Sequence, residues 1–185
     1  MNNNIEIIDN YLDQEYFDSL VAFFMDDKGP QVIEWTMVRN IEGPGNPDAS
    51  VKLFYMTHIF YVDIIMGLDN GKKVYGVGHI SSPFFEKILP LLDKLNIKSL
   101  IRVKANLYPY SGETLHEHRM HTDYEFPHYA ALLSLNTCDG YTKLEDGTKV
   151  ESIANRILHF DGSQKHCSTT TTSKFARINI NINYL

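Results

Sequence analysis

The chain has 185 residues, 43% of them hydrophobic, and a formal net charge of −6, values that are ordinary for one globular domain. Its basic residues are scattered rather than gathered in a stripe, which argues against a nucleic-acid surface. The most apolar stretch, HIFYVDIIMGL, is interrupted by Asp63 and is too short to span a bilayer. Cys138 and Cys167 form no CxxC pair, and the first residues carry no secretion signal, so we expect a cytoplasmic protein with reduced thiols.

The N-terminal residues predict a strand and then a helix. Residues 5–8 read as a short strand, and residues 13–27 place aromatic and leucine side chains at helical spacing. We expect Gly29 and Pro30 to end this helix. The segment 41–50 contains two prolines and two glycines and is predicted to be a loop.

Residues 51–98 predict two strands and a second helix. Aromatic and β-branched runs indicate strands at about 51–65 and 73–79, joined by a turn in LDNGKK. Ser82 precedes a proline, a pairing typical of a helix start, because the hydroxyl caps free amides and proline has no N–H to lose. The helix is predicted to span 83–95, with a kink near Pro90.

From residue 99 onward the pattern is strand throughout, with Asp146-Gly147 as a tight hairpin and 168–173 as a loop. Early helices followed by many short strands predict a mainly β fold with flanking α elements, a β-sandwich or barrel. We expect one domain over 1–185, in which 1–98 supports a core formed by 99–185. Two facing antiparallel sheets should form this core, with both helices packed against one of them.

The stretch HRMHTDYEFPHY, residues 118–129, gathers three histidines and an aspartate. Side chains two apart on a strand share a face, so His121 and Asp123 should project together. His166, at an expected strand end, is placed to supply a third ligand. Two histidines and one carboxylate on one octahedral face leave three open positions, as in non-haem Fe(II) oxygenases. An HxD alone is weak evidence, and a surface strand with incidental histidines remains an alternative. We interpret the neighbouring histidines as structural or as supports for a ligand: His116, His118 and His128.

Polar residues alternate with isoleucines in the last strand, FARINININYL. Asparagine is a poor strand former, so the row Arg177, Asn179 and Asn181 favours a buried polar site over a solvent-facing edge. The guanidinium of Arg177 offers a fork that suits a carboxylate, which makes an anionic ligand plausible. Asn106 and Tyr108 share a face in KANLYPYSG and could hold another part of that anion. A mixed sheet face is the alternative for this second pair.

In this order and spacing, the motifs resemble the Fe(II)/2-oxoglutarate-dependent oxygenases, particularly the prolyl-4-hydroxylase-like branch. The family pattern of HxD, a distal histidine and an arginine is matched by His121-Thr122-Asp123, His166 and Arg177, and its earlier tyrosine by Tyr108. SLNTCDGYTKLEDG is similar to the family's LN…GGxTxF segment, and IIDNYLDQEYFDSL to its opening helix. Residues 36–98 match nothing in the family. The resemblance implies a double-stranded β-helix, or jelly roll, buttressed by N-terminal helices.

Two features depart from that pattern. The family's glycine pair is Asp139-Gly140 here, and the LSLN strand lacks the tyrosine that some hydroxylases use for 2-oxoglutarate. Asn106-Leu107-Tyr108 and Arg177-Ile178-Asn179 look instead like the cosubstrate clamps of the alkylated-nucleic-acid demethylases. These departures bear on the substrate subclass.

The resemblance implies that His121, Asp123 and His166 bind Fe(II). Arg177 and Tyr108 would bind 2-oxoglutarate, with Asn106 and Asn179 beside them, and Arg156 is the rival anchor for its far carboxylate. The activity implied is hydroxylation of a C–H bond with O2, releasing succinate and CO2, and the family also makes ascorbate a candidate reductant.

Three functions therefore compete. The first is hydroxylation of a protein or peptide, in the manner of prolyl hydroxylases, or of a small molecule. The second is nucleic-acid demethylation on the same fold, which the acidic charge disfavours. The third is a non-catalytic jelly roll that binds a metal or sugar, which would not need the carboxylate anchor.

Overall fold

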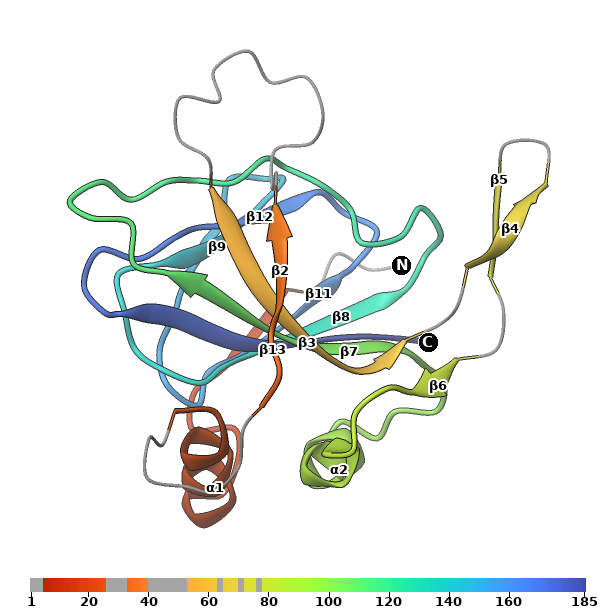
Figure 1. The fold of residues 1–185 in the computed structure, drawn as a ribbon, viewed down its shortest axis with the longest axis horizontal. Helices are drawn as coiled ribbons and strands as arrows, with labels where there is room; N and C mark the ends of the chain where they lie inside the picture. The colour runs from red at the N-terminus through yellow and green to blue at the C-terminus, as the bar shows by residue number, and fades with distance from the viewer. Residues whose placement is uncertain (1–4, 26–32, 40–52, 63–64, 70–71, 76–77) are drawn as a thin grey trace.

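A computed structural model describes residues 5–25, 33–39, 53–62, 65–69, 72–75 and 78–185. A large twisted sheet carries helical segments on one side and a small sheet on the other (Figure 1). The helical segments are α1 (Gln14–Met25), η1 (Phe85–Ile88, a 3₁₀ turn) and α2 (Leu89–Lys94). The strands before the second helix are β1 (Glu6–Ile8), β2 (Thr36–Arg39), β3 (Phe54–Val62), β4 (Ile65–Asp69), β5 (Lys72–Tyr75) and β6 (His79–Ile80). Those after it are β7 (Leu100–Pro109), β8 (Tyr129–Ser134), β9 (Tyr141–Leu144), β10 (Lys149–Glu151), β11 (Ile157–Asp161), β12 (His166–Ser168) and β13 (Ala176–Tyr184).

The large sheet has the order β1-β11-β8-β13-β7-β3-β2, with β6 paired to β3, and every pairing in it is antiparallel. The small sheet has the order β10-β9-β12, and β4 pairs with β5 as a separate hairpin. The predicted mainly β jelly roll with two facing antiparallel sheets is therefore confirmed. Strands β1, β2 and β3 widen the large sheet beyond the expected core of residues 99–185.

The apolar core lies between the large sheet and the helices, because the sheet turns its isoleucine face to that side. Ile178, Ile180 and Ile182 are fully buried on β13 and belong to one cluster with Phe17, Leu20 and Phe24 of α1 and Leu91 of α2. Burial of one large aliphatic side chain contributes roughly 1.5–3 kcal/mol. The opposite face of the same strand therefore points into the space between the two sheets.

A smaller cluster fills part of the space between the sheets. Its members come from β8 and β11 on one side and from β9 and β10 on the other, and they are Ala130, Leu132, Leu144, Val150, Leu158 and Phe160. This cluster occupies one end of the interior. The remaining interior, in front of β7 and β13, is lined by polar side chains.

The first helix forms where the sequence predicts it. Asp13 accepts a hydrogen bond from the backbone N–H of Tyr16 at 3.0 Å, so its carboxylate caps the first turn of α1. The last two expected helical residues, 26–27, lie outside the described residues, as do Gly29-Pro30 and the loop 41–50.

The middle segment differs from its prediction in two ways. The strand expected at 51–65 ends at residue 62, and the strand expected at 73–79 is two separate elements, β5 and β6. The expected turn falls between β4 and β5, although residues 70–71 lie outside the described part. Short strands with changes of partner are hard to read from composition, since only pairing decides where each one ends.

The second helix is split rather than kinked. Pro90 lies in the first turn of α2, where its missing N–H costs nothing, and the preceding turn is the separate 3₁₀ segment η1. Ser82 does cap an amide, since its hydroxyl accepts the N–H of Phe84 at 3.1 Å, but the helical turn begins later than expected.

The threonine run that was expected to be a loop makes backbone pairings with other segments. Thr169 forms an isolated β-bridge with Glu117, and Thr171 forms one with Tyr110. Thr169, Thr170 and Thr171 are each 1% exposed or less. Their hydroxyls and their β-branched shape suit this buried edge.

In the described residues, no helix is both long and apolar enough to cross a membrane.

Candidate metal centre

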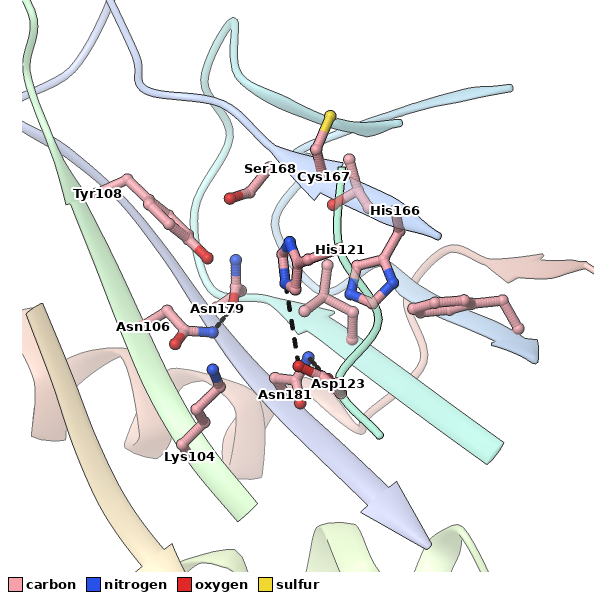
Figure 2. Close-up of a pocket in the computed structure, with 13 residues that line it drawn as sticks. Lys104, Asn106, Tyr108, His121, Asp123, His166, Cys167, Ser168, Asn179 and Asn181 are labelled. Carbon is pink, nitrogen blue, oxygen red and sulfur yellow. Dashed lines mark hydrogen bonds and ion pairs between the residues drawn. The ribbon is translucent and has the colours of Figure 1, made fainter. Parts of the chain in front are cut away.

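A pocket opens between the two sheets, in front of β7 and β13 (Figure 2). Most of the described residues that line it have polar side chains, and the full set is Lys104, Asn106, Tyr108, His121, Asp123, Leu132, Thr142, Phe160, His166, Cys167, Ser168, Asn179 and Asn181. All three candidate metal ligands line the pocket, and so do the candidate cosubstrate residues other than Arg177.

His121 and His166 are brought together by direct backbone pairing. Each donates its N–H to the other's carbonyl at 2.9 Å, which forms an isolated antiparallel bridge. The two side chains consequently leave the bridge side by side, with ring centroids 4.8 Å apart. His166 also meets the edge of Phe160 at 5.0 Å. Two histidines far apart in sequence thus converge because their strands pair at this point.

Hydrogen bonds set the tautomer of both rings. His121 Nδ1 lies 3.1 Å from the carbonyl of Arg119, and His166 Nδ1 lies 3.1 Å from the carbonyl of Gln164. A carbonyl only accepts, so each Nδ1 carries the proton and each Nε2 keeps a lone pair. Burial lowers the pKa of His166 to about 4, so this ring is neutral at neutral pH. Neutral imidazoles with Nδ1 held by a carbonyl are the form that ligates metals.

Asp123 is fixed from behind by a cation and an amide. Arg102 Nη2 lies 2.7 Å from Asp123 Oδ1, and the amide of Asn183 donates to Oδ2 at 3.0 Å. Burial by itself would raise the pKa of Asp123, but Arg102 and Lys104 outweigh it and hold the pKa well below its ordinary value. The carboxylate is therefore ionised and oriented before any metal arrives.

A further residue supports this clamp. His128 is fully buried, and its ring lies 3.3 Å from the amide nitrogen of Asn183. Gly162 makes room for it, because a Cβ there would come within 2.2 Å of the ring. His128 therefore holds the residue that holds Asp123. His118 is also buried and bonds Ser168 through Nδ1 at 2.8 Å, so both histidines have the supporting or structural place expected for them.

His121, Asp123 and His166 form a group whose potential ligand atoms all lie within 4.8 Å of one another. His121 Nε2 is 4.0 Å from Asp123 Oδ1, and both lone-pair nitrogens and the carboxylate face the pocket (Figure 2). Two imidazoles and one carboxylate on one side of a cavity suit a non-haem Fe(II) ion, with open positions on the cavity side. The donor set thus fits the metal that the resemblance implies.

Strands β7 and β13 present a ladder of four polar pairs to the pocket side. In register, Tyr108 lies opposite Arg177, Asn106 opposite Asn179, Lys104 opposite Asn181 and Arg102 opposite Asn183. The last pair is joined by a hydrogen bond from Arg102 Nη2 to Asn183 Oδ1 at 2.9 Å. The end of the ladder at Arg102 and Asn183 holds Asp123, and the other end carries Arg177.

Arg177 is 1% exposed and forms no ion pair with any described acid. Its Nη1 donates to the Tyr141 carbonyl at 2.9 Å and its Nη2 to Thr142 Oγ1 at 2.8 Å, while its guanidinium lies 5.6 Å from the Tyr108 ring. It does not itself line the pocket; Tyr108 and Thr142, which touch it, do. A buried guanidinium with neutral neighbours only is costly, and burial lowers its pKa.

The departure at Asp139-Gly140 leaves this arginine undisturbed. A Cβ at Gly140 would come within 2.7 Å of Arg177 Cδ, so glycine is required where the side chain passes. Asp139 accepts hydrogen bonds from the backbone N–H groups of Thr172 and Ser173 at 3.0 Å and 3.2 Å. Its carboxylate thereby orders the turn that leads into β13.

Buried polar atoms without a hydrogen-bond partner occur along the ladder, at Arg102 Nε and Arg177 Nε near its two ends and at three amide atoms in its middle. The Asn106 amide donates to Asn179 Oδ1 at 3.0 Å, which leaves Asn106 Oδ1 and Asn179 Nδ2 unbonded, and Asn181 Oδ1 is also unbonded. Exchanging the two amide ends of the bonded pair still leaves one donor and one acceptor unused. Buried polar groups are almost always satisfied, so these atoms indicate the place of a polar ligand.

No protein-family model matches the sequence, and no curated protein matches it either. Solved structures do. An oxidoreductase of the 2OG-Fe(II) oxygenase family from Burkholderia pseudomallei aligns with a TM-score of 0.67 at 13% identity, over 97% of this chain and 84% of its own. A prolyl hydroxylase from Trichoplax adhaerens, in complex with a hypoxia inducible factor oxygen degradation domain peptide fragment, gives 0.60 at 16% identity, over 100% and 84%. A prolyl-4-hydroxylase from Pseudomonas putida gives 0.55 at 12% identity, over 99% and 93%.

The chain has the fold of the 2OG-Fe(II) oxygenases. At these identities the likeness concerns the fold, and the resemblance to the prolyl-4-hydroxylase-like branch is confirmed at that level. The three candidate ligands lie together in the pocket of this fold, and Arg177 lies directly behind its wall.

The rival anchor does not reach this oxygenase-like pocket. Arg156 pairs instead with Asp9, from Nε to Oδ1 at 2.5 Å and from Nη2 to Oδ2 at 2.9 Å, at a site where the Asp9 side chain is 51% exposed. Sequence reasoning missed Arg102, Lys104 and Asn183. The signal was available, because each continues the alternation already recognised on its strand.

The two arginine–aspartate pairs of this oxygenase fold provide a matched stability test. Arg102→Met leaves Asp123 buried without its cation, so the free energy of unfolding of the metal-free protein should fall by roughly 3–5 kcal/mol. Arg156→Met removes an exposed pair and should cost at most about 1 kcal/mol. Urea denaturation of both variants measures the difference. Equal losses would show that Arg102 does not carry the clamp.

Proposed function

We propose that this protein is an Fe(II)- and 2-oxoglutarate-dependent dioxygenase that hydroxylates a C–H bond of a protein or peptide. The observation that carries the proposal is the pairing of two features on one sheet face. A group of two histidines and one aspartate lies at one end of the ladder, and a buried arginine without an acidic partner lies at the other. A cosubstrate that binds a metal at one end and carries a carboxylate at the other needs both.

His121, Asp123 and His166 would hold the metal ion. Bound there with 2-oxoglutarate and O2, Fe(II) supplies the oxidising chemistry, in which the cosubstrate becomes succinate and CO2 and one oxygen atom enters the substrate's C–H bond. The protein's part is ligation and orientation. Carbonyls hold both imidazoles in the ligating tautomer, and Arg102 and Asn183 hold the carboxylate ionised. The ligands are therefore preorganised, which reduces the rearrangement that metal binding requires.

Arg177 would take the far carboxylate of 2-oxoglutarate. Its guanidinium reaches the pocket wall through Thr142 and Tyr108, and a carboxylate there would gain a charge-assisted contact that neutral groups do not offer. Tyr108 is 8% exposed, and burial raises its pKa to about 12, so its phenol stays protonated and can donate to the same carboxylate.

Asn106 and Asn179 would flank the middle of the cosubstrate. Each has one buried polar atom without a partner, and both line the pocket between the metal group and Arg177. A polar ligand between them could bond these amide atoms and so satisfy them. This gives the pair a role in orienting the cosubstrate along the ladder.

Two considerations favour a protein or peptide as the prime substrate. The structural neighbour from Trichoplax adhaerens is a prolyl hydroxylase that was solved with a peptide fragment, which makes the same substrate class the first candidate here. The net charge of −6 opposes binding to nucleic acid, for which cationic surface supplies most of the affinity. A small-molecule substrate is the alternative within the same chemistry.

Metal binding depends on the assigned ligands. Mn(II), an inert substitute for Fe(II), should bind the protein once, and His166→Ala should weaken it by more than the roughly 10–100-fold typical of losing a ligand's supporting residue. His118→Ala is the matched control, because His118 is equally buried and close by but outside the metal group. Electron paramagnetic resonance titration measures both. A larger loss in the His118 variant would reassign the site.

Cosubstrate binding depends on Arg177. Arg177→Met should weaken binding of 2-oxoglutarate to the Mn(II) protein by roughly 2–5 kcal/mol, because the far carboxylate loses its cation. Mn(II) affinity should stay close to that of the wild type, since Arg177 lies at the far end of the ladder. Arg156→Met, which removes an arginine that pairs with Asp9 and does not line the pocket, should leave both affinities unchanged. Isothermal titration calorimetry measures them. If Arg156→Met abolished cosubstrate binding while Arg177→Met did not, Arg177 would be the wrong anchor.

The reaction itself is tested by the product. Host-lysate peptides incubated with the protein, Fe(II) and 2-oxoglutarate should show a gain of one oxygen atom by mass spectrometry, with succinate released. The Asp123→Asn variant should give neither, because a neutral amide replaces the ionised ligand. Succinate release without any modified peptide would favour a small-molecule substrate, and no succinate release under any condition would contradict the enzyme.

A further inference from the structure

Lys104 is a cation inside the pocket that the cosubstrate assignment leaves unused. It lies on β7 between Arg102 and Asn106, and it faces Asn181 across the ladder. Lys104 lines the pocket, whereas Arg177 lies behind the pocket wall. Figure 2 shows its side chain directed towards Asn106 and Asn179, on the same side of the pocket as Asp123.

Lys104 forms no ion pair with any acid in the described part of the chain. Asp123, the acidic residue that lines the pocket, is in direct contact with Arg102 instead. Among the residues that the structure describes, the ammonium contacts one aromatic ring, that of Tyr55, whose centroid lies 5.7 Å away. Burial lowers the pKa of Lys104 to about 8, although Asp123 acts in the opposite direction, so the group is mainly protonated at neutral pH.

The charges on this sheet face do not balance without a further anion. Arg102 is matched by Asp123, and the proposed function matches Arg177 with the far carboxylate of 2-oxoglutarate. Lys104 remains, and an Fe(II) ion beside Asp123 would add more positive charge next to it. A partly buried ammonium near a divalent cation is unfavourable unless an anion lies between them.

We propose that Lys104 is a second carboxylate-binding point, at the metal end of the pocket and opposite Arg177. The inference rests on the proposed function, which fixes where the metal and the far carboxylate lie. The carboxylate that Lys104 binds belongs to one of two molecules. One is the cosubstrate's own carboxylate nearest the metal, and the other is an acidic group of the prime substrate.

The spacing along β7 supports two separate anion sites. Lys104 and Tyr108, which faces Arg177, are four residues apart, or roughly 13 Å along an extended strand. Asn106 lies between them and leaves one buried polar atom unpaired. One cation at each end, with unsatisfied amides in the middle, forms a pocket for an elongated molecule that is anionic at both ends.

The first experiment compares 2-oxoglutarate binding to the Mn(II) protein in three variants by calorimetry. Lys104→Met keeps the length of the side chain and removes its charge, Lys104→Arg keeps the charge, and Lys98→Met removes an exposed lysine just before the same strand. If the carboxylate is the cosubstrate's, Lys104→Met weakens binding about ten- to hundredfold, as for loss of a hydrogen bond to a charged group. Lys104→Arg should retain most of the affinity, and Lys98→Met all of it.

The second experiment uses bromide as an anion probe, located by anomalous scattering in crystals of the Mn(II) protein with and without 2-oxoglutarate. Bromide beside Lys104 that persists when 2-oxoglutarate is bound, and is absent in Lys104→Met, assigns the point to the prime substrate. Unchanged cosubstrate affinity in Lys104→Met together with no bromide beside Lys104 would overturn the inference. If the wild type bound no 2-oxoglutarate at all, the proposed function would fail, and the bromide data without cosubstrate would still decide whether Lys104 binds an anion.

Discussion

The alternation of β13 is the constraint on which the rest of the structure depends. This strand lies in the middle of the large sheet and is buried along nearly its whole length. Its isoleucines anchor the core shared with the helices, while the residues between them, Arg177, Asn179, Asn181 and Asn183, face the other way. A one-residue change of register would put four polar side chains into the apolar core. The hydrophobic face of the strand therefore fixes the orientation of its functional face.

Burying that polar face requires partners, and the partners define the two ends of the site. Asn183 is satisfied by Arg102, Asp123 and His128, which form a closed network behind one metal ligand. Such a network is rigid because every member restrains another. The middle of the ladder is satisfied only in part. One end thus holds a candidate metal ligand in place, and the adjoining length carries the unpaired amide atoms that a ligand would bond.

Much of this site could be predicted from the sequence because one simple period, the alternation of side chains along a strand, places its residues. The period of two placed Asn106 and Tyr108 on one face of β7, and Arg177 and Asn179 on one face of β13. In the structure the two strands are neighbours, and these residues pair in register. What the sequence could not supply was the pairing that joins distant segments. Nothing in residues 118–129 indicates that His121 shares a backbone bridge with His166.

The errors outside the site have the same physical origin. The split of the second helix follows from how proline is accommodated, and the broken strands near residue 75 follow from partners in β3 and β4. The threonine run looks like a polar loop in isolation. It is buried because Glu117 and Tyr110 offer backbone groups on its flank, which composition does not reveal. Local propensity is a weak guide wherever tertiary contacts decide the outcome.

A site that only binds metal would not need the remainder of the ladder. The metal group is fully served by its own carbonyl, guanidinium and amide contacts, all at one end. Arg177 and the half-satisfied pair Asn106 and Asn179 are explained by none of these contacts, and burying such groups without a full set of partners is costly. Costs of this kind collect at sites that act on a ligand, where unsatisfied groups become binding energy. The ladder therefore favours a pocket that turns over an anionic cosubstrate over a non-catalytic metal-binding jelly roll.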